Sequence, residues 1–160
     1  MVFMTQILSQ WNNFFPFSSM SSEGFYNLVE GIVKEHDYPG LSVSRKNHKE
    51  GGFFSSERQY LRVQRGDLVF DICAAPFGKD FYVSWWLFET EDAIRRFFKG
   101  SLVANFLAQR ASNRTFYQAD VEAIFRESIH SCVLQAIEHI TNETGRKLSE
   151  HEKQIQVGGY

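Results

Sequence analysis

The stretch YLRVQRGDLVFDICAAPFGKDFYVSWW, residues 60–86, decides the fold class because polar and apolar side chains alternate along much of it. A period of two is typical of a β-strand whose two faces meet different environments. The dipeptides Gly66-Asp67 and Gly78-Lys79 interrupt the alternation, and both suit a two-residue hairpin turn. The stretch therefore predicts three antiparallel strands joined by two tight hairpins.

The first hairpin places an arginine and an aspartate on the same face of the sheet. With the Gly-Asp pair at the centre of the turn, Arg62 lies opposite Asp71 and Tyr60 lies opposite Cys73. The apolar residues between them point to the other face, because successive side chains of a strand alternate. We therefore expect an ion pair across the hairpin, on the less apolar face.

The second hairpin leaves two registers open. A two-residue turn places Ile72 opposite Trp85 and Asp71 opposite Trp86, which keeps one face apolar throughout. A three-residue loop would move Trp85 onto the face of Arg62, because a slip of one residue exchanges the faces of all side chains. The apolar pattern favours the two-residue turn.

The flanking segments complete the prediction of an α+β fold. Alternation that begins at Leu41 predicts a fourth strand, and a helix capped by Ser21 or Ser22 precedes it. Short helices are expected over 90–112, and capping-box spacing predicts a long helix over about 115–142.

The predicted organisation has three parts. Residues 1–20 form an amphipathic aromatic helix, residues 21–145 form a single α+β domain, and residues 146–160 form a polar, frayed tail. The domain contains a four-stranded antiparallel meander sheet with N-terminal helices, and the long C-terminal helix packs across one face.

The first segment carries large apolar side chains at helical spacing, which predicts a helix ended by Pro16. It contains no Lys or Arg to face lipid headgroups, so a position in a membrane interface is disfavoured. We expect the helix to dock on its own domain, on a second copy of the chain or on a protein partner. The residues predicted to bind the partner are Phe3, Ile7, Trp11, Phe14 and Phe15.

The composition argues against several classes of protein and site. A net charge of −2 and a pI near 6.2 give no global electrostatic reason to expect nucleic acid or an anionic membrane as the partner. Two cysteines, Cys73 and Cys132, are too few for a disulfide framework or a four-cysteine zinc site, and the histidines lack metal-ligand spacing. No metal or other cofactor is predicted. Neither a signal peptide nor a membrane-spanning run is recognisable, so a cytoplasmic location is expected.

Arg62 and Asp71 form the first candidate site. Flanked by Tyr60, Ser84 and Trp86, they can form the floor of a site for a small anionic ligand, with the guanidinium as an anion clamp and the indole as a stacking surface. A structural ion pair that needs no ligand is the simpler interpretation.

Residues 45–65 form the second candidate site because they contain six basic and two acidic residues, a net charge of +4. Together with the nearby Phe53 and Phe54, they can contact nucleic acid or phosphate groups. A solvated or edge-protecting set of charges is commoner. Nucleic-acid binding is therefore retained as an alternative that is not favoured.

The sequence contains no recognisable catalytic signature: no phosphate-binding glycine loop, no nucleophile elbow and no paired carboxylates. Both cysteines lie within apolar patterns, which favours inert buried thiols over a Cys–His nucleophile. The leading hypothesis is a non-enzymatic binding or protein-interaction module. The alternative is an enzyme or small-ligand receptor that uses the face of Arg62 and Asp71.

The segments SRKNHKEGG, SSERQYLRV, RGDLVFDICAAPFG and SWW, between Ser44 and Trp86, resemble a family of mostly bacterial hypothetical proteins. In that family a similar stretch precedes a segment like TFYQADVEAIFRESIHSCVLQAIEHI, here residues 115–140. Many members carry a hydrophobic, membrane-like insert between SWW and the final helix. The corresponding interval here, residues 87–114, is short and charged, so no membrane anchor is expected for this chain. The resemblance implies no activity, cofactor or catalytic residue.

Overall fold

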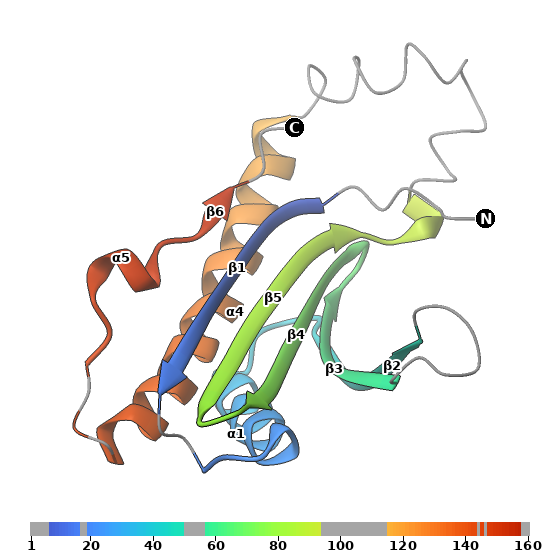
Figure 1. Ribbon diagram of the computed structural model, residues 1–160. Coiled ribbons are helices and arrows are strands. Elements are labelled where there is room, and N and C mark those ends of the chain that lie inside the picture. The colour runs from blue at the N-terminus through green and yellow to red at the C-terminus, as the bar shows by residue number, and fades with distance from the viewer. Residues whose placement is uncertain are drawn as a thin grey trace.

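The computed structural model describes residues 7–16, 19–49, 57–93, 115–143, 145 and 147–157, and it consists of an antiparallel sheet with helices packed against it (Figure 1). The elements in chain order are β1 (Ile7–Pro16), α1 (Ser22–Glu35), β2 (Ser42–Lys49), β3 (Glu57–Arg65), β4 (Leu68–Phe77), β5 (Asp80–Glu89), α4 (Phe116–Glu143), α5 (Glu150–Lys153) and β6 (Gln156–Val157).

The sheet has the strand order β2-β3-β4-β5-β1-β6, and neighbouring strands are antiparallel. Five of the strands have eight residues or more, and β6 adds two residues at one edge. The predicted α+β class is confirmed, whereas the predicted count of four strands is too low. Of the short helices predicted over 90–112, the described part contains the beginning, where Thr90 Oγ1 accepts a hydrogen bond from Ala93 N at 3.3 Å.

The central meander of β3, β4 and β5 forms largely in the predicted register. Gly66 and Gly78 have φ angles of 56° and 62°, in a region that residues with a Cβ rarely adopt. Each glycine takes the first central position of a two-residue turn. The second turn places Ile72 opposite Trp85, so the two-residue register is confirmed and the three-residue alternative is wrong.

The segment predicted to be the N-terminal helix contains a strand instead. β1 pairs antiparallel with β5 from Ile7 to Pro16, with a register shift between Ile7 and Ser9. Trp11 and Phe15 point into the core and are 3% and 2% exposed. The prediction failed because β5 would otherwise be a sheet edge with unpaired backbone groups, and a strand satisfies those groups where a helix cannot.

Helices α1 and α4 cover the same face of the sheet, which we call the helix face. Ser21 caps α1, as predicted. Phe25 of α1 contacts Phe81, and Phe125 of α4 contacts Phe70, with ring centroids 5.6 Å and 6.1 Å apart. α4 crosses behind β1 and β5 in Figure 1, so that view looks onto the opposite face, which we call the outer face.

The long C-terminal helix forms as predicted. Thr115 Oγ1 accepts a hydrogen bond from Gln118 N at 3.2 Å, and Gln118 Oε1 accepts one from Thr115 N at 3.3 Å, which completes a capping box. The helix has 28 residues and spans about 42 Å, enough to cross the sheet. Among the described residues, no helix combines the length and the apolar character needed to cross a membrane.

The C-terminal segment 147–157 packs on β1 and α4 instead of forming a frayed tail. Trp11 Nε1 donates a hydrogen bond to the carbonyl oxygen of Glu152 at 2.8 Å, and β6 pairs with β1. His130 Nδ1 accepts a hydrogen bond from Trp85 Nε1 at 2.9 Å, so its proton is on Nε2, which donates to the carbonyl oxygen of Lys153 at 2.8 Å. These contacts fix a neutral imidazole between the sheet and the segment.

Candidate functional site

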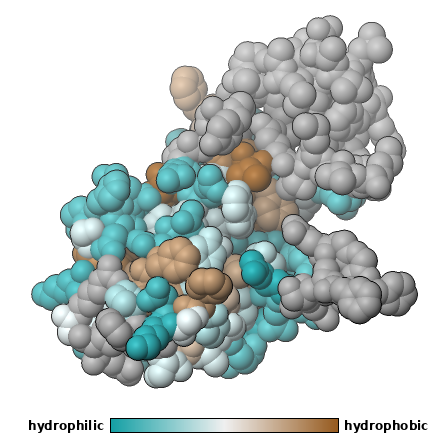
Figure 2. Space-filling model, viewed as in Figure 1, coloured by the Kyte–Doolittle hydropathy of each residue, from teal (hydrophilic) through white to brown (hydrophobic). Residues whose placement is uncertain are grey.

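The outer face is the candidate site because no described helix covers it. Its side chains come from alternate positions of β1 to β5, on the side that points away from α1 and α4. Figure 2 looks onto this side of the molecule and shows hydrophobic side chains among hydrophilic ones.

Arg62 and Asp71 lie opposite each other on the outer face, as predicted. Nε and Nη2 of Arg62 donate to Oδ1 and Oδ2 of Asp71, each at 2.7 Å, in a bidentate pair. The side chain of Asp71 is 5% exposed and that of Arg62 is 19% exposed. The guanidinium also lies 5.6 Å from the ring centroid of Phe88. Because the pair uses two of the five N–H donors of the guanidinium, Arg62 retains donors for another partner.

β3 separates from β4 five pairs after the turn, and the hydroxyl of Tyr26 lies between the two strands there. The hydroxyl of Tyr26 donates a hydrogen bond to the carbonyl oxygen of Gln59 at 2.8 Å and accepts one from Ala74 N at 2.9 Å. If the pairing of β3 with β4 continued beyond Leu61, Gln59 would lie opposite Ala74. The phenol of Tyr26 therefore takes the place of a direct backbone hydrogen bond between these two residues. The predicted pairing of Tyr60 with Cys73 consequently does not form.

Beyond this separation, β3 turns away from β4 and carries β2 with it (Figure 1). His48 is four residues further along β2 than Ser44, the partner of Arg62. Four residues of a flat strand correspond to about 13 Å, yet His48 Nε2 lies 3.4 Å from Asp71 Oδ2. The β2–β3 ribbon is therefore bent, so that the end of β2 that carries His48 comes close to Asp71. Tyr60 packs edge-on against His48, with ring centroids 5.0 Å apart.

Aromatic rings line the other side of the outer face, on β5 and β1. Trp86 lies opposite Asp71 and is partly exposed, whereas the neighbouring Ser84 is buried. Phe14 of β1 is 50% exposed and packs against Tyr82, with ring centroids 4.9 Å apart. The outer face thus has most of its charged residues on β2, β3 and β4 and most of its rings on β5 and β1.

The chemistry of the described outer-face residues does not favour covalent catalysis or metal binding. Burial raises the pKa of the Cys73 thiol, and the nearby Arg58 offsets this only in part, so the thiol stays protonated and weakly nucleophilic at neutral pH. The one carboxylate at the centre of the face, Asp71, is already bound by Arg62. Within the described ranges no group of three or more His, Cys, Asp and Glu side chains is suited to hold a metal ion.

The predicted basic segment divides between the two faces of the sheet. Arg45 points to the helix face and donates hydrogen bonds to a carboxylate and an amide of α1, both at 2.9 Å. Arg65 also lies on that side. Lys46, Arg58 and Arg62 lie on the outer face. The outer face therefore keeps part of the predicted cluster.

The residues predicted to bind a partner are also separated by the alternation of β1. Trp11 and Phe15 are in the core, whereas Ile7 and Phe14 are exposed. Phe3 lies outside the described residues. Docking through an N-terminal helix is therefore wrong for the described part of the segment, while self-association or docking on a partner stays a prediction.

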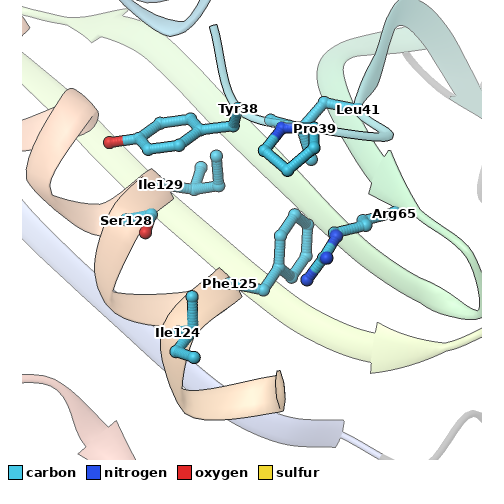
Figure 3. A pocket seen from close by; sticks show the side chains of 8 residues that line it. All are labelled: Tyr38, Pro39, Leu41, Arg65, Ile124, Phe125, Ser128 and Ile129. Atoms are coloured by element: carbon cyan, nitrogen blue, oxygen red, sulfur yellow. The ribbon is translucent and has the colours of Figure 1, made fainter. Parts of the chain in front are cut away.

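A shallow pocket lies on the helix side of the molecule, between α4 and the connection from α1 to β2 (Figure 3). The ring of Phe125 and the side chain of Arg65 lie side by side in it, and Tyr38 forms part of its wall. Its volume of about 80 Å³ is well below the roughly 300 Å³ at which small-molecule sites begin. We therefore do not regard it as the functional site.

Two side chains of the outer face, His48 and Phe88, were not among the predicted site residues, and neither was Tyr26, which shapes that face. The alternation along β2 already placed His48 on the face of Arg62, but its contact with Asp71 depends on the bend of the ribbon. No local pattern indicated that Tyr26 would enter the sheet.

No protein-family model, no curated protein and no solved structure matches this chain. The functional interpretation therefore depends on the geometry of the outer face.

Proposed function

We propose that this protein is a non-enzymatic binding module that holds an extended anionic partner against its outer face. The observation that carries the proposal is the distance of 3.4 Å between His48 and Asp71, which requires a bend of the β2–β3 ribbon toward Asp71. The bend brings polar side chains of β2 closer to Arg62 and Asp71, where one partner can contact them together.

The charge of this face favours an anion. Lys46 and Arg58 are exposed and Arg62 is partly exposed, whereas Asp71 is the one carboxylate at the same face of β2, β3 and β4 within the described residues. Across β2 to β5 of this face, three positive charges thus lie with two carboxylates, those of Asp71 and the exposed Asp80. Electrostatic complementarity of this kind supports both the rate and the specificity of association.

The geometry favours an extended partner over a small molecule. Small ligands need an enclosed cavity in which most of their surface is buried, whereas the rings and charges of the outer face are distributed over five strands. A receptor or enzyme for a small anion, centred on Arg62 and Asp71, is the alternative. Because both carboxylate oxygens of Asp71 already accept hydrogen bonds from Arg62, the pair serves better as a rigid floor than as a reacting pair.

The test compares two lysines in different places. Lys46→Glu reverses a charge on the outer face, and Lys147→Glu makes the same charge change at an exposed site near the end of α4. We measure the binding of fluorescently labelled polyglutamate, oligo(dT) and a heparin oligosaccharide at low ionic strength. Reversing a charge near an anion is expected to weaken binding by on the order of ten-fold, and the control is expected to weaken it less than about two-fold.

Two results would refute the proposal. One is that none of the three polyanions binds at low ionic strength. The other is that Lys46→Glu and Lys147→Glu weaken binding equally, which would indicate a nonspecific effect of net charge. Circular dichroism spectra of both variants establish that the fold is retained.

A further inference from the structure

We infer, on the basis of the binding function proposed above, that the anionic partner is a single-stranded nucleic acid. In this arrangement its bases stack on the rings of β5 and β1, and its phosphates face the cations of β2 and β3. The inference rests on exposed rings and cations that share one face of the sheet.

Exposed aromatic rings lie on the outer face of β1 and β5. Phe14, Tyr82, Trp86 and Phe88 all occupy outer-face positions of two neighbouring strands, and each is at least partly exposed. Partly exposed rings on the open face of a sheet are suited to stack with bases, because every base has a flat π-surface. An acidic peptide such as polyglutamate satisfies the cations but offers nothing flat to the rings.

The cations of the same face belong to β2 and β3. Arg62 on β3 is two strands away from Trp86 on β5, which corresponds to about 10 Å across the sheet. Lys46 lies further in the same direction, on β2, whereas the side chain of Arg58 reaches Cys73 of β4. A nucleotide can use both kinds of side chain, since it presents a flat aromatic base at one end and a charged phosphate at the other. The guanidinium of Arg62, which already packs over the ring of Phe88, can itself stack with a base.

A single-stranded nucleic acid suits these rings better than a duplex does. Bases within a duplex are covered on both sides by their neighbours, so stacking on protein rings requires unpaired bases. A duplex supplies phosphates alone and would leave Tyr82 and Trp86 without partners.

The experiment uses the intrinsic fluorescence of the full chain. The protein has three tryptophans, of which Trp11 and Trp85 are buried in the core and Trp86 is partly exposed on the outer face. Oligo(dT) is expected to quench the emission of Trp86 on binding, and Trp86→Phe is expected to remove the quench. Phe14→Ser is expected to weaken oligo(dT) binding about five-fold or more through the loss of one stacking partner. Phe116→Ser, which changes a phenylalanine that is 93% exposed on α4, serves as the matched control and should leave binding unchanged.

The outcomes separate this inference from the proposed function. Polyglutamate or a duplex that binds as tightly as oligo(dT), or oligo(dT) that binds without quenching Trp86, would overturn the inference and leave an anion-binding face. Failure of every polyanion to bind would overturn both. An unchanged affinity in Phe14→Ser with a retained fold would likewise exclude base stacking on β1.

Discussion

The hydroxyl of Tyr26 is the single group whose removal most directly tests how the sheet is shaped. It joins Gln59 of β3 to Ala74 of β4 through hydrogen bonds of 2.8 and 2.9 Å, and its residue is 1% exposed. Burial raises the pKa of this phenol, so it remains a neutral donor and acceptor at any pH at which the protein is studied. The substitution Tyr26→Phe deletes the oxygen and keeps the ring.

The expected decrease in the free energy of unfolding follows from the two backbone groups that lose their hydrogen bonds to the phenol. Ala74 is buried, so its N–H group loses its partner without gaining water, which costs about 1–3 kcal/mol. The carbonyl group of Gln59 belongs to an exposed residue that water can reach, so its loss adds about 1 kcal/mol. The free energy of unfolding of Tyr26→Phe should therefore fall by about 2–4 kcal/mol. This corresponds to a decrease in Tm of about 5–15 °C for a chain of this size.

The assay is chemical and thermal unfolding followed by far-UV circular dichroism, with amide hydrogen exchange at Ala74. Tyr117→Phe removes a hydroxyl from a residue that is 77% exposed on α4, and it should change stability by less than about 0.5 kcal/mol. A loss in Tyr26→Phe no larger than that of this control, with the Ala74 amide still protected from exchange, would refute the role assigned to the phenol.

Two further predictions concern buried polar groups. Asp71→Asn should lower the free energy of unfolding by about 2 kcal/mol, less than for a fully buried pair because the guanidinium of Arg62 is 19% exposed. A double-mutant cycle with Arg62→Met measures the coupling, and a coupling near zero would contradict the prediction. Burial lowers the pKa of His130 from its ordinary value of 6.5. As the pH falls below about 6.5, the imidazole of the unfolded chain therefore takes up a proton, whereas the imidazole of the native chain stays neutral. Its contribution to the free energy of unfolding is thus fully present above that pH and decreases progressively below it. Urea unfolding between pH 7.5 and 5.5 should show a steeper loss of stability in the wild type than in His130→Gln, and identical slopes would contradict this prediction.

The meander could be predicted from the sequence because its information is local. The turn glycines Gly66 and Gly78 fix the registers of both hairpins, and the alternation between them decides which face is apolar. The cross-strand pairing of Arg62 with Asp71 follows from the first turn alone. The predicted register ends five pairs from that turn, where the phenol of Tyr26 bonds to both strands in place of a direct backbone hydrogen bond.

The strand β1 could not be predicted because its apolar positions fit two patterns. Leu8, Trp11 and Phe15 have helical spacing, but Trp11 and Phe15 also lie on the same face of a strand, with Asn13 between them. The partner that decides between the patterns is β5, more than sixty residues away in the chain. The weak helix propensity of asparagine and the strand propensity of the aromatic residues were signals for the strand.

The bend of the β2–β3 ribbon is held from the opposite side of the sheet. Tyr26 belongs to α1, on the helix face, yet its hydroxyl determines where β3 leaves β4. Arg45 of β2 packs over the ring of Tyr26, 5.6 Å from its centroid, and also bonds to Glu30 of α1 at 2.9 Å. The ribbon is therefore anchored to α1 where the bend begins, while its far end brings His48 to Asp71. Because two anchors on a helix fix the bend, the curvature is a property of the packed fold and not of individual side-chain rotamers. The shape offered to a partner should therefore be present before the partner binds.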